Sequence, residues 1–325
     1  MEKNIVQRVR ECVQVPKKPR IDEVLKLLPH NADAAYYRER TDRNIGWITR
    51  EEQKLLSRRV IGIAGCGGMG AQLAEKFLRL GVGEIRIADN EAFDVSNINR
   101  QFAATRKTVG VSKAFATARM LRDISDDNTI VVYPQGICES SVQDFTHGCD
   151  VICDEIEFWA VGPRILLHQE ARREGVPVFN CNTVGFGTRL FLFTPDSSTM
   201  EELLHMSLEE AMVLSVALAQ KTASKAQISR VMESVLEGLV PELPDYYQGG
   251  GNAEIVRQRL FTEGRASIIA TNPPLATGFL ADRVLLYLLR NSQTKRCVVE
   301  TPKMPAYLYF DAARMEAKTM NGRLS

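Results

Sequence analysis

Short runs of β-branched and aliphatic residues alternate with longer amphipathic segments through the middle of the chain. The apolar runs predict strands at 60–64, 84–88, 129–133, 150–153 and 177–180. Between them, apolar positions at helical spacing predict helices at about 68–80, 112–124 and 159–174. Strands that are apolar at nearly every position are typical of parallel sheets covered by helices on both faces. The pattern therefore predicts an α/β core over residues 58–195 with a doubly wound, mostly parallel sheet.

Two segments of different character flank this core. Residues 1–57 are polar, with short helical patterns at 21–28 and 49–56, and Thr49 and Glu52 have the spacing of a capping box. We interpret 1–57 as an N-terminal helical segment that serves as a dimer contact or a substrate clamp.

The C-terminal part, residues 196–325, is predicted to be a helical and short-strand extension that completes the same domain. Before it, 188–193 predicts a strand that leaves the sheet. Leu204 to Leu218 share one helical face, and the extension has further predicted features, which are helices at 225–239 and from 275, a loop at 241–252, and short strands near 298 and 307.

Charge and cysteine usage exclude several function classes. The chain has 325 residues, with 41 Lys+Arg against 40 Asp+Glu, so no bulk positive field attracts nucleic acid or acidic membrane. The longest apolar tract, 275–289, is interrupted by Asp282 and Arg283 and predicts a buried helix, not a membrane span. Seven cysteines without a CxxC pair favour a reducing, cytoplasmic setting.

A glycine-rich turn follows the first predicted strand of the core. Residues 65–70 read Gly-Cys-Gly-Gly-Met-Gly and are followed by a helical pattern, an order in which the backbone approaches a phosphate or ribose. Asp89 ends the next strand, where an acidic side chain accepts hydrogen bonds from ribose hydroxyls. We therefore predict a nucleotide site; the alternative is a tight helix–strand junction whose glycines serve packing alone.

The segment after Asp89 narrows the kind of nucleotide. It contains Ser-Asn-Ile-Asn-Arg-Gln at 96–101, and Lys113 follows a dozen residues later. Arg100 offers a planar fork of donors and Lys113 a compact charge, and both suit the oxygens of a triphosphate and the charge that builds up as pyrophosphate leaves. A solvated charged loop is the plainer alternative.

These motifs resemble those of the ThiF–MoeB–HesA superfamily, whose members include the enzymes that activate ubiquitin-like proteins. The resemblance extends from about Tyr37 to Phe310 and includes a motif like Tyr309-Phe310-Asp311 found in a bacterial branch. It implies a Rossmann-like fold that binds ATP with magnesium and adenylates a carboxylate. The nucleotide residues that it implies are Gly65, Gly67, Gly70, Asp89, Asn97 and Gln101, with Arg100 and Lys113 as catalytic residues.

The resemblance also implies a homodimer. Arg43 matches the arginine that members of this superfamily extend to the partner's ATP. The alternative for Arg43 is a local ion pair with Asp42 or Glu39.

The segment 150–158 departs from the pattern of the superfamily. Asp154 keeps the first acid, the magnesium-associated acid falls on Glu157, and the asparagine of many relatives is replaced by Phe158. Glutamate still offers oxygen ligands to magnesium, so we predict Glu157 and Asp154 as the metal ligands. Asp154 otherwise ends the strand and caps the next helix.

Cysteine placement predicts adenylation without a covalent cysteine stage and without structural zinc. Residues 201–296 contain no cysteine, although relatives that form a thioester carry one in the segment after the sheet. Cys181 follows a strand end and is the cysteine that we expect to be exposed at the sheet's carboxyl edge.

Three functions follow, in order of preference. The first is an ATP-dependent adenylyltransferase that activates the C-terminus of a ubiquitin-like protein or peptide, or a modified tRNA base; near-neutral composition disfavours the tRNA. The second is a catalytically degenerate relative that binds nucleotide or a partner, suggested by Glu157 and Phe158. The third is an NAD-dependent oxidoreductase, suggested only by the glycine turn and Asp89.

Overall fold

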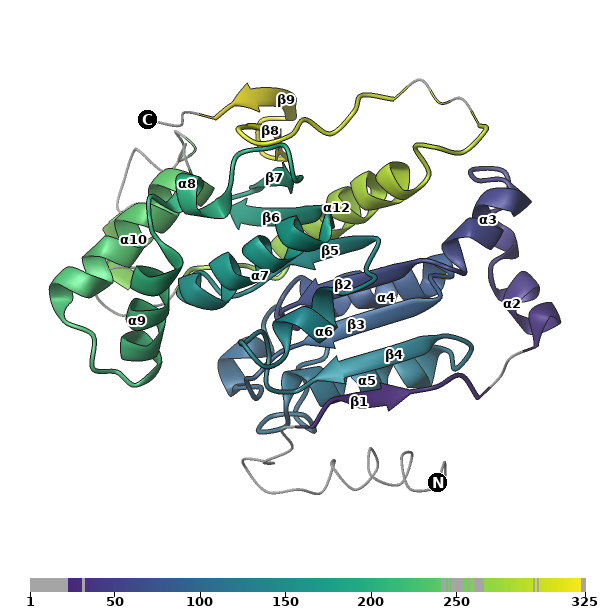
Figure 1. Ribbon diagram of the computed structural model, residues 1–325, viewed down its shortest axis with the longest axis horizontal. Helices are drawn as coiled ribbons and strands as arrows, with labels where there is room; N and C mark the ends of the chain where they lie inside the picture. Colours follow the sequence, from purple (N-terminus) through teal and green to yellow (C-terminus); the bar gives the residue numbers. More distant parts are fainter. Residues whose placement is uncertain are drawn as a thin grey trace.

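The chain forms a mixed α/β fold around one twisted sheet (Figure 1). The computed structural model describes residues 23–30, 33–240, 244, 246, 254–256, 258–259, 266–294, 296 and 298–322. The sheet contains, within these residues, nine strands, which are β1 (Leu25–Leu27), β2 (Val60–Ala64), β3 (Glu84–Ala88), β4 (Thr129–Tyr133), β5 (Val151–Asp154), β6 (Val178–Val184), β7 (Gly187–Phe193), β8 (Ala306–Asp311) and β9 (Glu316–Asn321).

The five central strands are parallel, in the order β4-β3-β2-β5-β6. This confirms the predicted strands and the doubly wound core. The predicted departure of 188–193 is wrong, because β7 stays in the sheet and pairs antiparallel with β6. β8 and β9 extend that edge as further antiparallel strands.

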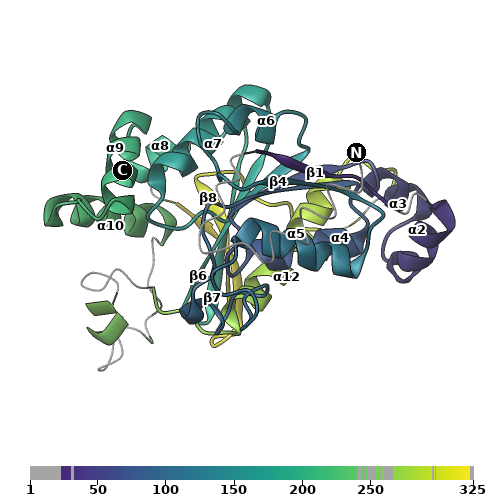
Figure 2. The same ribbon diagram turned by 90° about the horizontal axis from the view of Figure 1, so that it is seen from below.

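Helices cover both faces of the sheet, as the views in Figures 1 and 2 show. One face packs against α4, α5 and α12, and the other against α6 and α7, with α8, α9 and α10 beyond. The helices are α2 (Ala34–Arg40), η2 (Asp42–Asn44), α3 (Arg50–Leu56), α4 (Gly70–Leu80), η3 (Val95–Asn97), α5 (Lys113–Ile124), α6 (Val142–Thr146), α7 (Val161–Glu174), α8 (Met200–Leu204), α9 (Leu208–Ala219), α10 (Lys225–Leu239) and α12 (Asn272–Leu288). Among the described residues, no helix combines the length and apolarity that crossing a membrane requires.

Three local predictions are corrected by tertiary pairing. The segment predicted to be helical at 21–28 contains β1, because its backbone pairs antiparallel with β4 and covers that strand's edge. The helical face from Leu204 to Leu218 is split into α8 and α9 at His205, whose backbone is left-handed with φ 47°. Val298 lies in an exposed irregular segment instead of a strand. The predicted loop at 241–252 lies outside the described residues, apart from Pro244 and Tyr246.

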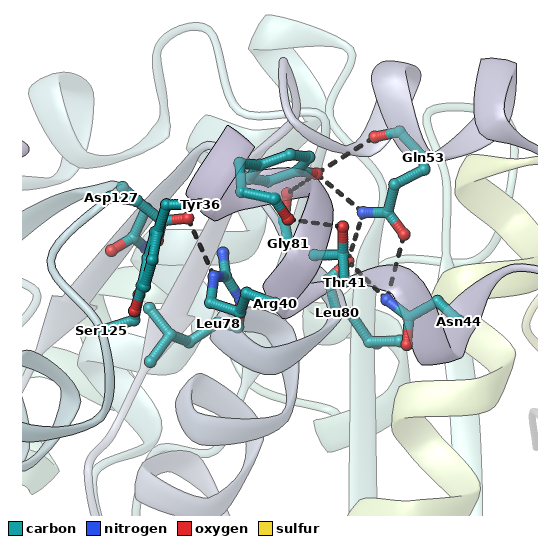
Figure 3. A network of polar contacts seen from close by, with 12 residues as sticks. Tyr36, Arg40, Thr41, Asn44, Gln53, Leu78, Leu80, Gly81, Ser125 and Asp127 are labelled. Atoms are coloured by element: carbon teal, nitrogen blue, oxygen red, sulfur yellow. Dashed lines mark hydrogen bonds and ion pairs between the residues drawn. The ribbon is translucent and has the colours of Figure 1, made fainter. Parts of the chain in front are cut away.

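The segment before the sheet packs against the C-terminal end of α4 (Figure 3). Arg40 Nη1 donates to Leu78 O at 2.8 Å, and Gln53 Nε2 donates to Leu80 O at 2.9 Å. Asn44 Nδ2 donates to Gln53 Oε1 at 3.0 Å, which ties η2 to α3. These contacts fix η2 at the end of α4 that is farthest from the glycine turn.

The predicted capping box at α3 is confirmed, and its acid has a second role. Glu52 accepts the backbone N–H of Thr49 at 2.8 Å, and Arg296 donates to both Glu52 oxygens at 2.6 Å. Ser292 Oγ donates to Glu52 Oε1 at 2.6 Å. This buried carboxylate therefore links α3 to the segment after α12.

We expect Glu52→Gln to lower the free energy of unfolding by about 2 kcal/mol at neutral pH. The hydrogen bonds from Arg296, helped by Ser292 and Thr49, outweigh burial and lower the pKa of Glu52 to about 2 from 4.5. Because the folded-state pKa is depressed, the stabilisation is present above pH 4.5 and is lost as pH falls toward 2. Urea unfolding at several pH values should show wild type and variant converging in acid. Glu51→Gln, one position away and exposed, is the control; parallel curves for Glu52→Gln and wild type would contradict the expectation.

Candidate active site

The glycine turn lies where the sheet changes winding direction, between β2 and β5 at the carboxyl edge. Gly65 has φ 101°, and a Cβ there would lie 2.2 Å from Glu155 O. A Cβ at Gly70 would lie 1.8 Å from Gly65 O. Both positions therefore exclude any side chain. Ligands of doubly wound folds bind at such a topological switch point.

Asp89 is held against this turn directly after β3. Its Oδ2 accepts the backbone N–H of Cys66 at 2.7 Å, and its Oδ1 accepts that of Glu91 at 2.8 Å. Burial raises the pKa of Asp89 to about 6 from 3.8, and the charge of Lys113 offsets part of that increase. The carboxylate is thus oriented by the backbone that it faces.

Lys113 begins α5 and brings a buried cation to the same place. Its Nζ lies 2.5 Å from Glu91 Oε2. Burial alone would lower the pKa of Lys113, but the charges of Asp89 and Glu91 outweigh it and raise the pKa. Glu91 was not predicted as a site residue, although its place directly after Asp89 was a usable signal. Lys113 is therefore charged at neutral pH and needs a new anionic partner when it leaves Glu91.

A cavity of about 110 Å³ joins these groups; we call it the nucleotide pocket. It is lined by residues from the ends of the parallel strands and from α5, among them Gly65, Gly67, Asp89, Lys113, Glu155 and Glu157. The structure thus brings together the predicted turn, the predicted ribose acid and the predicted lysine.

A second pocket of about 100 Å³ adjoins the first and shares Gly67, Glu155, Ile156 and Glu157 with it. It extends to the ends of β5 and β6 and to the segment after η3. Its lining includes Arg100, Gln101, Asp154, Arg164, Asn182 and Ile268. Arg100 and Gln101, predicted beside the phosphates, therefore lie next to the nucleotide pocket.

Asp154 is fully buried beneath the second pocket. Its Oδ2 accepts from Arg164 Nε at 2.9 Å and lies 3.0 Å from His168 Nε2, and its Oδ1 accepts from Ile156 N at 3.1 Å. Burial raises the pKa of this carboxyl, but Arg164 and His168 outweigh burial and lower it. Sequence reasoning missed Arg164, because its contact with Asp154 depends on how α7 packs on β5.

Glu157 presents the more accessible carboxylate. It is exposed and lines both pockets. Within the described part of the chain, no three His, Cys, Asp or Glu side chains are grouped to hold a metal ion. Magnesium is usually held by one or two carboxylates together with substrate phosphates and water, so a single accessible carboxylate fits that donor set.

Three predicted residues lie elsewhere in the structure. Asn97 Oδ1 accepts the backbone N–H of Asp94 at 3.0 Å and so caps η3. Arg43 is exposed on η2, at the far end of α4, a helix of 11 residues and therefore about 16 Å long. Cys181, expected to be exposed, is 2% exposed and bonded to Thr188 Oγ1 at 2.9 Å, because β7 covers it. Burial raises the pKa of its thiol well above the ordinary value.

ATP affinity is expected to fall below about pH 6, by about tenfold per pH unit, because the Asp89 carboxylate that accepts ribose hydroxyls becomes protonated there. Asp89→Asn should bind more weakly at pH 7.5 and lose less affinity on acidification. Calorimetric titration with ATP between pH 5 and 8 measures both profiles. Because ATP phosphates also titrate, parallel profiles for the two proteins would assign the effect to ATP alone.

The sequence model of the ThiF family matches residues 41–324, most of the chain. The chain is 29% identical over 143 residues to the SAMP-activating enzyme E1 of Haloferax volcanii, covering 44% of this chain and 52% of that protein. It is 28% identical over 149 residues to the sulfur carrier protein ThiS adenylyltransferase of Bacillus subtilis, covering 45% and 44%. The chain thus spans about half the length of the curated relatives it matches.

Solved structures share the fold. PaaA superposes with a TM-score of 0.59 at 14% identity, covering 98% of this chain and 91% of PaaA. Escherichia coli MccB with MccA superposes with a TM-score of 0.56 at 15% identity, covering 84% and 66%. At such identities the likeness concerns architecture alone. Since the family match runs from η2 through β9, the chain belongs to the ThiF family.

Proposed function

We propose that this protein is an ATP-dependent adenylyltransferase that activates a carboxylate of a small protein or peptide, here called the acceptor. The observation that carries the proposal is the joining of a phosphate-binding glycine turn, Asp89 and the buried cation Lys113 in one pocket. The names of the relatives, which include adenylyltransferases, support it. An oxidoreductase has no evident use for a buried lysine beside the glycine turn.

The chemistry follows from the two adjoining pockets. An acceptor carboxylate oxygen attacks the α-phosphorus of ATP, the new O–P bond forms, and the bond to pyrophosphate breaks. Lys113 and Arg100 lie where they offset the charge that grows on the leaving pyrophosphate. The turn from Gly65 to Gly70 and Asp89 position the nucleotide, and the step needs no proton transfer.

Magnesium, when bound, would neutralise phosphate charge. Glu157 would hold it from the rim, while Asp154, occupied by Arg164 and His168, would orient the strand end below. We expect Glu157→Gln to weaken the dependence of ATP binding on magnesium, measured as the ratio of ATP affinities with and without MgCl₂. Glu139→Gln, an exposed control on another loop, should leave that ratio unchanged.

A homodimer would complete the site. The far placement of Arg43 on η2 supports a role at the partner's pocket, because its own pocket lies at the other end of α4. Residues 1–57 would form the dimer contact or substrate clamp and 196–325 would contribute acceptor specificity, in a cytoplasmic enzyme.

The first test is the thermal stability of the protein with MgATP and, separately, with NADH. A ligand at a hundredfold excess over its Kd adds about 2.7 kcal/mol of stability. We expect a rise in melting temperature with MgATP alone that Asp89→Ala abolishes. A rise with NADH and none with MgATP would refute the proposal in favour of an oxidoreductase.

A further inference from the structure

The second pocket lies where the acceptor must reach the nucleotide. It shares four lining residues with the nucleotide pocket, Gly67 of the glycine turn among them. On its other side are the ends of β5 and β6 and residues just before α12. A group bound in it would therefore stand beside the phosphates of ATP.

The lining of this pocket is polar and includes unsatisfied groups. Gln101 is 6% exposed and Arg164 is 1% exposed, and both line the pocket. Gln101 Oε1 and Arg164 Nη1 are buried without a hydrogen-bond partner in the described structure. Unpaired buried polar groups are costly, so a ligand that pairs with them would gain from doing so.

Two asparagines from β6 add ordered amides to the same wall. Asn182 Nδ2 donates to Asn180 Oδ1 at 2.7 Å, and Asn180 Nδ2 donates to Asp154 O at 2.7 Å. The chain of amides fixes the orientation of Asn182, which is 4% exposed and lines the pocket.

The charges of the lining favour a neutral ligand group. Asp154 already pairs with Arg164, so the remaining N–H of Arg164 suits a neutral acceptor oxygen better than a second carboxylate. The nearby Glu155 and Glu157 carboxylates stand opposite Arg100, which leaves little net charge. A neutral group that both donates and accepts hydrogen bonds matches this lining.

The outer wall of the pocket is held in place by three contacts. Asn99 Nδ2 donates to Ile268 O at 3.0 Å, and Asn272 Nδ2 donates to Gly185 O. The Tyr246 hydroxyl accepts from Phe186 N at 3.0 Å and donates to Asp311 Oδ2 at 2.8 Å. The last contact also places Asp311 of the Tyr-Phe-Asp motif at this edge of the sheet, so the pocket is built from both sides.

We propose that the second pocket receives the C-terminal residue of a peptide acceptor and selects one with a short, neutral, hydrogen-bonding side chain, a hydroxyl or a carboxamide. The inference rests on the proposed adenylyltransferase function. A terminal glycine or alanine would leave Gln101, Arg164 and Asn182 without new partners, and a charged side chain would upset the balance of the lining. Asn182 is then a specificity-determining residue.

The test uses pools of octapeptides with seven randomised positions and one fixed C-terminal residue, assayed by ATP–pyrophosphate exchange. We expect pools ending in Ser or Asn to give kcat/KM about tenfold above pools ending in Gly, Ala or Lys. Equal rates for all pools, or the highest rate for the glycine pool, would overturn the assignment.

Two variants connect the preference to the pocket. Asn182→Ala should reduce the difference between the Ser or Asn pools and the alanine pool to within about twofold, with the MgATP-induced thermal shift unchanged. Asn182→Ser, which keeps a hydrogen-bonding group, should retain part of the preference and covers the case in which alanine disturbs folding. Asn128→Ala removes another buried asparagine at the opposite end of the sheet and is the matched control. A preference that survives in Asn182→Ala would overturn the role of Asn182.

The outcomes separate this inference from the proposed function. If no pool supports exchange while MgATP still raises the melting temperature, the peptide-terminus inference falls and nucleotide binding stands. If MgATP has no effect on stability, the proposed function itself falls.

Discussion

Lys113→Ala is expected to lower the rate of ATP–pyrophosphate exchange by about 100- to 1,000-fold. Lys113 is the buried cation of the nucleotide pocket, and its Nζ lies 2.5 Å from Glu91 Oε2 in the absence of phosphate. Without it, the charge on departing pyrophosphate meets only Arg100 and the backbone of the turn. Exchange of radiolabelled pyrophosphate into ATP, driven by an active peptide pool, measures the effect.

The control for this experiment is Lys107→Ala, an exposed lysine from the same connection between β3 and α5. It should retain at least about half of the exchange rate, since surface substitutions away from a site usually change little. Removing Lys113 also leaves Glu91 unpaired, so the melting temperature of each variant is measured first. A folded Lys113→Ala protein with wild-type exchange would disprove the phosphate role of this lysine.

Arg43→Ala should also lower exchange by about 100-fold, although Arg43 lies far from the pocket of its own chain. The decisive measurement is a mixture. Combining equal amounts of Arg43→Ala and Lys113→Ala subunits should restore about a quarter of wild-type activity, because half of the dimers are mixed and each mixed dimer has one intact site out of two. The reason is that one subunit supplies the intact pocket and the other the intact arginine.

Arg38→Ala is the matched control, since Arg38 is an exposed arginine on α2 and so belongs to the same packed segment. It should be active by itself and need no complementation. If the mixture of Arg43→Ala and Lys113→Ala stays as inactive as its parts while mixed dimers form, Arg43 does not act across a shared site.

The core of the fold was predictable because its determinants are local. The apolar runs coincide with β2, β3 and β4 residue for residue, and the Thr49 and Glu52 pair forms the capping box that its spacing predicts. The glycines at 65 and 70 are needed because any Cβ would overlap backbone atoms, a constraint that sequence expresses directly.

The remainder depended on partners that are distant in the chain. β1 is a strand only because the edge of β4 accepts it, and its own residues have a helical pattern. Asp154 carries a signal as an acid after a strand, but Arg164 and His168 reach it only after α7 has packed on the sheet. The break between α8 and α9 rests on the left-handed backbone of His205, a residue with no glycine-like signature.

Because each pocket draws its arginine from the other subunit's η2, the genetics of this protein would depend on how mutations are distributed between gene copies. Two alleles that each carry one lesion, at Arg43 or at Lys113, would complement each other in one cell. The same two lesions on a single allele would poison the wild-type product, since every mixed dimer would pair a sound pocket with a missing arginine and a sound arginine with a broken pocket. Such an allele would leave about a quarter of the normal activity at equal expression, and the wild-type copy alone would yield half.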